Sequence, residues 1–317
     1  MSGFGTRTQN ARILQDRLAM YRKMADLRVN PTKRPLHKKT IALRKNLLDL
    51  LATLDKPVTC RQVFYQATVH GLVKKAETGY RQVQRQLLEM RREGVTPYAT
   101  IADNTRWMRK PRTYTGLADV LESTAAQYRA SVWAELDTHV ELWCEKDALA
   151  SVLYQETHRF DVPLMVARGY SSETFAFESA DAIRNSGKDR AWIYYVGDFD
   201  PSGWDMSENL KAKLLEFIGS DIDVQFIRLA ITPTQVNTMN LPSRPTKTTD
   251  ARCKRFFELF GNDAPSIELD AIHPNQLRQL VRDALEQHLP DGWLDRIERE
   301  EQAAREALAD IAQHWAA

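Results

Sequence analysis

The sequence predicts an α/β protein whose first third is helical and whose remainder folds around a mostly parallel sheet. Three observations support this class. Amphipathic segments joined by short turns fill residues 39–112, strands and helices alternate from residue 139 onward, and the sign of the charge changes between the two regions. The chain has 317 residues, of which 43% are hydrophobic and 27% are charged, a globular composition that excludes a disordered or collagen-like chain.

The net charge of +2 is the sum of two unequal parts. Residues 1–112 contain 24 Lys and Arg against 8 Asp and Glu, which leaves 20 of the 44 basic and 34 of the 42 acidic residues for the rest of the chain. This asymmetry predicts that the basic part meets a polyanion, whereas the acidic part stays in solvent or concentrates carboxylates around cations. On charge alone, an ordinary solvated basic face is the alternative.

The N-terminal region divides into an arm and a compact module. We expect residues 1–38 to form a helical arm and a basic linker, because apolar residues recur at helical spacing and are followed by Pro, Lys and Arg. Residues 39–112 have the pattern of a winged helix-turn-helix, in which three short helices precede an extended wing. The expected helices span residues 40–54, 59–69 and 77–92, and the extended stretch spans residues 96–102.

The third of these helices carries a stripe of arginines. Arg81, Arg85 and Arg92 fall within about 40° of one another on a helical wheel, on a different side from the apolar residues. Guanidinium groups match phosphates and guanine edges, so the stripe predicts contact with double-stranded DNA. The alternative is an ordinary charged helix face. A basic run farther along adds Arg106, Arg109 and Lys110 to the predicted DNA contacts.

The acidic remainder is predicted to form one sheet domain with flanking helices. Residues 113–138 are a connector, residues 139–290 form the sheet domain, and residues 291–317 form a charged amphipathic helix. Strict alternation of strands and helices implies a mostly parallel sheet covered on both faces. The expected strands are residues 140–144, 162–167, 191–196, 224–231 and 267–269, and the expected helices are residues 147–158, 172–185, 202–218 and 274–287.

Acidic residues follow two of the predicted strands. Glu145 comes directly after the first strand, and Asp198 and Asp200 follow the third. The carboxyl ends of parallel strands meet at one sheet edge, where functional groups collect. Carboxylate oxygens are the ligands that Mg²⁺ prefers, so we expect a magnesium site at this edge. The alternative for either aspartate singly is a turn or a helix cap.

These motifs resemble those of a Toprim domain. Residues 144–148 (Cys-Glu-Lys-Asp-Ala) and 198–203 (Asp-Phe-Asp-Pro-Ser-Gly) are similar to the version in the A subunit of topoisomerase VI and its meiotic double-strand-break relatives. Residues 268–272 (Glu-Leu-Asp-Ala-Ile) also look like the end of that domain. The resemblance covers residues 40–289, and it implies a winged helix followed by a Toprim domain.

The same family carries a catalytic tyrosine on its winged-helix module. Its motif, an Arg shortly before an aromatic pair, is matched by residues 60–65 (Cys-Arg-Gln-Val-Phe-Tyr). The resemblance therefore implies that Tyr65 is the nucleophile and that Arg61 neutralises the phosphate. On a helix, Tyr65 lies about 140° from Cys60, off the apolar stripe and one turn after Arg61. Tyr65 therefore need not be a core residue, and a partly buried structural tyrosine is the alternative.

The resemblance also implies a reaction and an assembly. The reaction is Mg²⁺-dependent transesterification that leaves a 5′-phosphotyrosyl bond, in a homodimer in which the tyrosine of one protomer meets the metal site of the other. A complete type IIB topoisomerase needs a GHKL-type ATPase as its B subunit. This chain has neither a Gly-x-Gly-x-x-Gly motif nor a Walker Gly-Lys-Ser/Thr motif, so the ATPase would be a separate partner.

The sequence contains no apolar run of the roughly 20 residues that a membrane helix needs, and its first residues lack the apolar core of a signal peptide. We therefore expect a cytoplasmic, nucleoid-associated protein with no membrane partner. Two other functions stay open. One is a Toprim nuclease that cuts DNA with metal-activated water, and the other is a non-catalytic DNA-binding protein. The presence of three acids at one edge argues against the second, because idle carboxylates would only repel one another.

Overall fold

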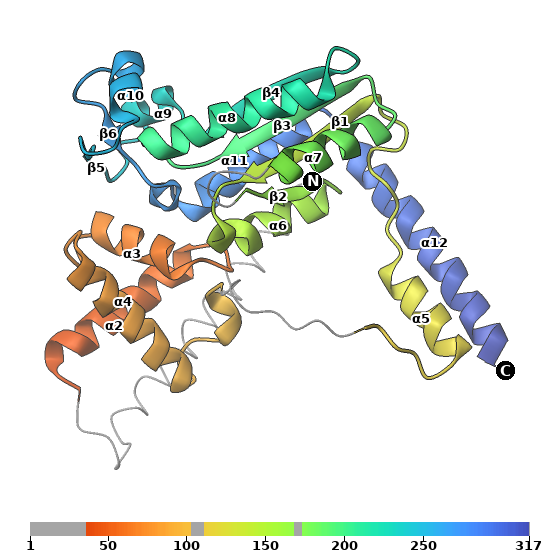
Figure 1. The fold of residues 1–317 in the computed structure, drawn as a ribbon. Coiled ribbons are helices and arrows are strands. Elements are labelled where there is room, and N and C mark those ends of the chain that lie inside the picture. The colour runs from red at the N-terminus through yellow and green to blue at the C-terminus, as the bar shows by residue number, and fades with distance from the viewer. Residues whose placement is uncertain (1–35, 103–110, 168–172, 317) are drawn as a thin grey trace.

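The computed structural model describes residues 36–102, 111–167 and 173–316. The predicted N-terminal helix and the predicted DNA contacts Arg106, Arg109 and Lys110 lie outside these residues. Within them, the α/β class is confirmed, with a helical unit that precedes a parallel sheet (Figure 1). No helix of the described residues combines the length and apolarity needed to cross a membrane.

The three predicted helices of the first unit are present. A row of leucines along the first helix is buried, and the second helix begins with a capping box between Thr59 and Gln62. Buried Arg44 donates to Gln86, Glu89 and Glu93, which fastens the first helix to the third. These helices are α2 (Lys38–Thr53), α3 (Cys60–Val69) and α4 (Glu77–Arg92).

The extended wing predicted for residues 96–102 differs from the structure. This stretch holds the short 3₁₀ helix η2 (Tyr98–Thr100) and a single parallel bridge between Ile101 and Val58. The Val58 N–H donates to the Thr100 carbonyl at 3.1 Å, and the Ala102 N–H donates back to Val58 at 2.9 Å. Residues 36–102 therefore form a three-helix unit with one bridge and no wing hairpin.

In the described residues the sheet has four strands, all parallel, in the order β2-β1-β3-β4. Its side chains alternate between the two faces, as the pleat requires. Leu142 and Tyr194 belong to one apolar cluster, whereas their chain neighbours Trp143 and Tyr195 belong to the other. The strands are β1 (Thr138–Cys144), β2 (Leu164–Val166), β3 (Arg190–Val196) and β4 (Asp223–Ala230).

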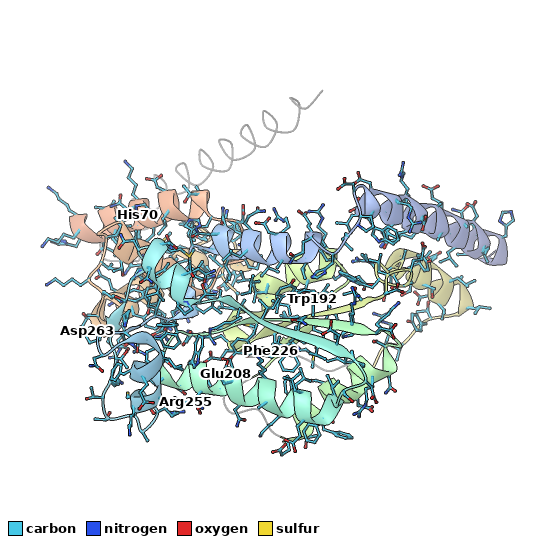
Figure 2. The ribbon with its side chains drawn as sticks, turned by 90° about the horizontal axis from the view of Figure 1, so that it is seen from above. His70, Trp192, Glu208, Phe226, Arg255 and Asp263 are labelled. Atoms are coloured by element: carbon cyan, nitrogen blue, oxygen red, sulfur yellow. The ribbon has the colours of Figure 1, made fainter. Side chains whose placement is uncertain are left out.

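Helices cover both faces of the sheet, which confirms the layering that the alternation predicts. Figure 2 shows Trp192 and Phe226 on opposite faces of the sheet. Trp192 packs toward His288, at 5.0 Å between ring centroids, and Phe226 packs against Trp143 at 5.8 Å. One face is covered by α6 (Ala150–Arg159) and α11 (Pro274–Glu286), and the other by α7 (Glu173–Asn185) and α8 (Pro201–Ile218).

A pair of helices projects from the sheet domain (Figure 1). The pair consists of α5 (Leu117–Gln127), within the predicted connector, and α12 (Trp293–Ala316), the predicted C-terminal helix. Arg305 donates to the Tyr128 carbonyl, and Glu301 accepts from the Ala130 N–H, so polar contacts fasten the base of the pair.

The segment after β4 is less regular than predicted. The strand expected at residues 267–269 is replaced by β6 (Pro265–Ser266), by a single bridge from Ile267 to Phe199, and by the 3₁₀ turn η4 (Leu269–Ala271). The bridge holds this segment against the end of β3, because Phe199 and Ile267 exchange backbone hydrogen bonds of 2.9 and 2.8 Å. The other elements here are α9 (Pro233–Thr238), β5 (Arg244–Pro245) and α10 (Cys253–Phe260).

Helix α11 joins the sheet domain to the three-helix unit. The guanidinium of Arg278, which is 2% exposed, donates to the carbonyls of Asp55 and Pro57 at 2.9 and 2.6 Å. Asn275 accepts from the Asp55 N–H at 2.8 Å. These bonds give partners to backbone groups of the loop between α2 and α3, and they fix the three-helix unit against the sheet domain.

Replacement of Arg278 by Met is expected to lower the free energy of unfolding by about 1–3 kcal/mol, because the loop between α2 and α3 loses two hydrogen bonds from a buried guanidinium. The measurement is urea denaturation followed by circular dichroism. Arg299→Met is the matched control, since Arg299 is exposed on α12 and, within the described part of the chain, donates only to the Asp295 carbonyl of the same helix. Equal stabilities for the two variants would contradict the role given to Arg278.

Candidate active site at the carboxyl edge of the sheet

Glu145 and Asp198 meet where β1 and β3 end. The Glu145 N–H donates to the Val196 carbonyl at 3.0 Å, and the side chain of Glu145 turns back so that Oε2 accepts from the Asp198 N–H at 2.9 Å. Between them lies Gly197, where a Cβ atom would come within 2.6 Å of Glu145 Oε2 and of the Tyr195 ring. The position of the Glu145 carboxylate therefore depends on the absence of a side chain at residue 197.

We expect Gly197→Ala to displace the Glu145 carboxylate and to lower the free energy of unfolding by about 1–3 kcal/mol, since the crowded atoms belong to a buried ring and a fixed carboxylate. Gly116→Ala is the control, because a Cβ there would meet nothing within 4 Å. Thermal unfolding of both variants checks this, and an unchanged midpoint for Gly197→Ala would show that the edge can rearrange freely.

Lys146 lies among the carboxylates at this end of the sheet. We call this cluster the acidic edge, and it consists of Glu145, Asp198, Asp200, Glu268 and Asp270. The Nζ atom of Lys146 is 2.8 Å from Asp198, 2.9 Å from Asp270 and 3.5 Å from Glu268. These carboxylates outweigh burial and raise the pKa of Lys146 well above its usual value, so the ammonium stays charged. A fixed cation is thus built into the edge.

The two predicted aspartates have different surroundings. Asp198 Oδ1 accepts from the Leu269 N–H at 2.7 Å, which ties the end of β3 to η4. Asp200 caps α8, with Oδ1 accepting from the Gly203 N–H at 2.8 Å. The cap expected as the alternative for Asp200 is therefore present.

The predicted acids lie at one edge, but their oxygen atoms do not converge. Across residues 36–102, 111–167 and 173–316, no three His, Cys, Asp or Glu side chains are arranged to hold a metal ion. Glu145 and Asp198 nevertheless have the chemistry of a cation site. Burial and the neighbouring Asp198 raise the pKa of Glu145 to about 7, and burial also raises the pKa of Asp198 despite Lys146. Two crowded, partly desolvated carboxylates are a donor set that suits Mg²⁺.

Helix α3 is anchored to this edge by its first turn. Arg61 makes a two-pronged ion pair with Glu268, with Nε to Oε2 at 2.7 Å and Nη2 to Oε1 at 2.9 Å. Burial would raise the pKa of Glu268, but Lys146 and Arg61 outweigh it and hold the pKa below its usual range. The Thr59 hydroxyl donates to Asp270 at 3.1 Å. The helix that carries Tyr65 is therefore joined to the acidic edge of the same chain.

Tyr65 is more buried than its helical position predicts. Its side chain belongs to the core and the residue is 5% exposed, so the expectation that it lies off the buried surface is wrong. The local apolar stripe of α3 does not take account of η4, which packs against this helix. Burial, and then the charge of Glu268, raise the pKa of Tyr65 to about 12. Lys75 Nζ lies 5.6 Å from the centre of its ring, and among the described residues no hydrogen bond is made to its hydroxyl.

The predicted arginine stripe on α4 faces solvent. Arg81 pairs with Glu77 at 3.0 Å and Arg85 pairs with Glu89 at 2.9 Å, while both arginine side chains remain 75% exposed. Arg92 is also exposed. Exposed pairs of this kind contribute little stability, so these arginines remain available to an anionic ligand.

Sequence reasoning did not assign roles to four residues that build the edge. Lys146 and Asp270 form its internal ion pair, Glu268 receives Arg61, and Arg244 lies 3.9 Å from Asp200 and 3.8 Å from Glu268. The Glu-x-Asp spacing of residues 268 and 270, just before a helix, is the one sequence signal that pointed toward them.

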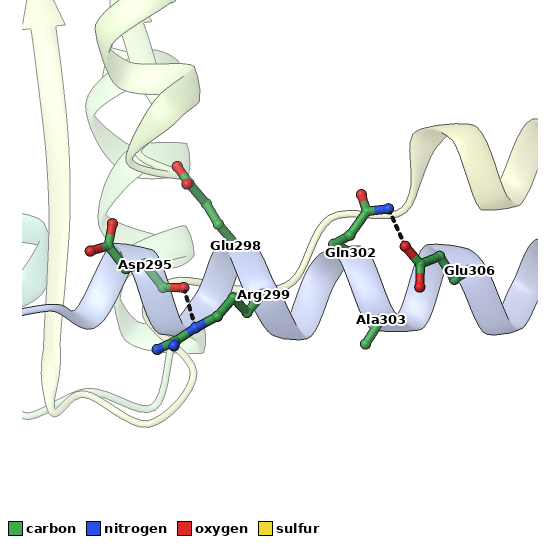
Figure 3. A pocket seen from close by; sticks show the side chains of 6 residues that line it. All are labelled: Asp295, Glu298, Arg299, Gln302, Ala303 and Glu306. Atoms are coloured by element: carbon green, nitrogen blue, oxygen red, sulfur yellow. Dashed lines mark hydrogen bonds between the residues drawn. The ribbon is translucent and has the colours of Figure 1, made fainter. Parts of the chain in front are cut away.

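A hollow on α12 has no comparable chemistry. Figure 3 shows its lining, which comes from that helix alone, and its polar contacts are within the helix: Arg299 to the Asp295 carbonyl, and Gln302 to Glu306. It is the outer surface of a charged helix.

No protein-family model, curated protein or solved structure matches this chain.

Proposed function

We propose that this protein cleaves double-stranded DNA by Mg²⁺-dependent transesterification at Tyr65, in the manner of a type IIB topoisomerase A subunit, with a winged-helix-like unit and a Toprim-like domain. The observation that carries the proposal is the ion pair between Arg61 and Glu268. It joins the tyrosine helix to the acidic sheet edge within one chain.

In the proposed step, the Tyr65 oxygen attacks a backbone phosphorus and forms a phosphotyrosyl ester to the 5′ end. The P–O3′ bond breaks, and the departing 3′ oxygen takes up a proton while the phenol loses one. The pKa of Tyr65, about 12, makes the neutral phenol a weak nucleophile. Arg61, one turn away, lowers that pKa, although Glu268, to which it is paired, raises it more; in the proposed step the guanidinium neutralises the phosphate.

Glu145 and Asp198 are the proposed magnesium ligands, with Asp200 at the same edge. A bound Mg²⁺ would supply positive charge to the phosphate and its leaving oxygen. Lys146 keeps Asp198 fixed by its 2.8 Å ion pair, so the edge is held in shape by residues of the chain itself.

Three partners complete the proposal. Double-stranded DNA lies along the exposed arginines of α4, a second copy of the chain provides the cut on the other strand, and strand passage depends on a separate GHKL-type ATPase. The ion pair of Arg61 lies within one chain, so each copy has the helix of its tyrosine joined to its own Glu268.

Hydrolysis by metal-activated water is the second candidate. The burial of Tyr65 favours it, because a core tyrosine with a raised pKa fits a structural role as well as a catalytic one. In that case the edge acids act in the same way, but the product carries free ends.

One experiment separates transesterification from hydrolysis. The protein is incubated with 5′-labelled or supercoiled DNA and Mg²⁺, the reaction is quenched with denaturant, and one half of each sample is then digested with protease. Label that stays with protein until digestion supports transesterification. Cut DNA with free ends under the same quench supports hydrolysis, and intact DNA at all Mg²⁺ concentrations argues against both.

A further inference from the structure

A cavity of about 620 Å³ opens beside the acidic edge, at the start of α8. This volume falls within the range of about 300–1,000 Å³ that is usual for ligand sites. Its lining comes from the start of α8, from the stretch of β5 and the loop that leads to α10, and from Ser266 of β6. Arg244, Lys247 and Arg252 supply its positive charges, and Asp200 and Asp250 its negative ones.

The negative charges in this cavity are already engaged. Asp250 receives Arg252 through both oxygens, at 2.7 and 2.8 Å, which also lowers its pKa. Asp200 caps α8. By contrast, Lys247 is exposed and its ammonium has no ion-pair or hydrogen-bond partner among the described residues, while Arg244 is 46% exposed and makes two long ion pairs, at 3.8 Å to Glu268 and 3.9 Å to Asp200. The three cations of the lining therefore outnumber its two carboxylates.

The cavity is connected to Tyr65 through Lys75. The ammonium of Lys75 lies over the Tyr65 ring and donates to the carbonyl of Ser243, the residue before Arg244. Burial and the charge of Arg244 lower the pKa of Lys75, with Glu268 opposing them, so these groups lie within electrostatic range of one another. A line of cations thus runs from the tyrosine through Lys75 and Arg244 to Lys247.

We propose that this cavity binds a backbone phosphate of the DNA strand that Tyr65 attacks, through Arg244 and Lys247. The inference rests on the proposed function for its ligand. It extends that function by assigning a second phosphate contact, which holds the strand in register with the tyrosine. Guanidinium and ammonium groups in a cavity of this size match a phosphodiester oxygen by charge and by hydrogen bonding.

The test is the salt dependence of DNA binding, measured by fluorescence anisotropy with a labelled duplex and a series of KCl concentrations. All variants carry Tyr65→Phe, so that cleavage does not enter. Loss of one phosphate contact lowers the slope of log affinity against log salt by about 0.9. We expect Lys247→Ala to show this decrease with weaker binding, and Lys247→Arg to restore the slope. Lys254→Ala is the control, because Lys254 is exposed on α10 and does not line the cavity.

Equal slopes for Lys247→Ala and Lys254→Ala would overturn the proposal. A second arm uses inorganic phosphate alone as competitor. If phosphate inhibits DNA binding and this inhibition disappears in Lys247→Ala, phosphate and DNA share the site. If phosphate binds at Lys247 but Lys247→Ala does not change the salt slope of DNA binding, the cavity is a site for free anions and the assignment to DNA is overturned. If the unaltered protein does not cleave DNA but the salt slopes of Lys247→Ala and Lys254→Ala still differ, the catalytic function is rejected and the phosphate site is retained.

Discussion

Tyr65→Phe is expected to abolish covalent attachment of the protein to 5′-labelled DNA, a loss of at least about 10³-fold in the rate of adduct formation, because the attacking oxygen is removed. The fold should survive. Phenylalanine fills the same buried volume, and the lost hydroxyl has no partner among the described side chains, so the free energy of unfolding should change by less than about 1 kcal/mol. Denaturing gels of labelled adducts measure the first effect, and urea denaturation measures the second.

Tyr80→Phe is the matched control for this variant. Tyr80 lies on α4, and its ring contacts Phe64 at 5.5 Å, so it shares the neighbourhood of Tyr65 without lying on the same helix. Adduct formation should persist in Tyr80→Phe. Adducts that persist in Tyr65→Phe and vanish in Tyr80→Phe would move the nucleophile to α4.

The second large effect is expected for Asp198→Asn. The amide keeps an oxygen for the Leu269 N–H but loses the charge that attracts Lys146 and would hold Mg²⁺. We expect cleavage to fall by about 10²–10³-fold, with DNA binding unchanged within about twofold, because the contacts to DNA lie elsewhere. The measurement is the cleavage rate of Asp198→Asn and of the unaltered protein at several Mg²⁺ concentrations, together with the affinity of each for the same duplex.

Asp181→Asn controls for the general loss of a carboxylate. Asp181 is exposed on α7, and its partners among the residues described are Arg184 and Asn185 of its own helix. Its rate should match that of the unaltered protein. Full activity of Asp198→Asn would remove the acidic edge from the proposed chemistry, whichever nucleophile is used.

Much of the fold could be predicted because local patterns agree with the tertiary structure. The helix of residues 77–92 has the predicted bounds, since its apolar stripe is uninterrupted and Gly94, at a φ of 70°, closes it. The β3 strand differs from its prediction by one residue, because an apolar run before Gly197 is typical of a buried parallel strand. The segment around residues 265–271 could not be predicted, since its pairing with residue 199 has no local signature.

The candidate site was predictable only in part. Strand ends place Glu145 and Asp198 together, and that placement is confirmed by the bond from the Asp198 N–H to Glu145. The burial of Tyr65 was missed, because the apolar stripe of α3 does not show the tertiary contacts of that helix, among them those with η4, about 200 residues later. Likewise, nothing near Lys146 in the sequence indicates that its ammonium pairs with Asp270. Contacts of this range depend on topology, which single-sequence patterns do not encode.

The most direct test of the account is to identify the residue that DNA becomes bound to. After reaction with DNA, nuclease trimming and trypsin, mass spectrometry should find the nucleotide mass on the peptide of residues 62–74, whose one tyrosine is Tyr65. The account predicts the adduct on this peptide, and predicts that it needs Mg²⁺. An adduct on the peptide of residues 76–81, which contains Tyr80, or cut DNA with every tyrosine peptide unmodified, would contradict it.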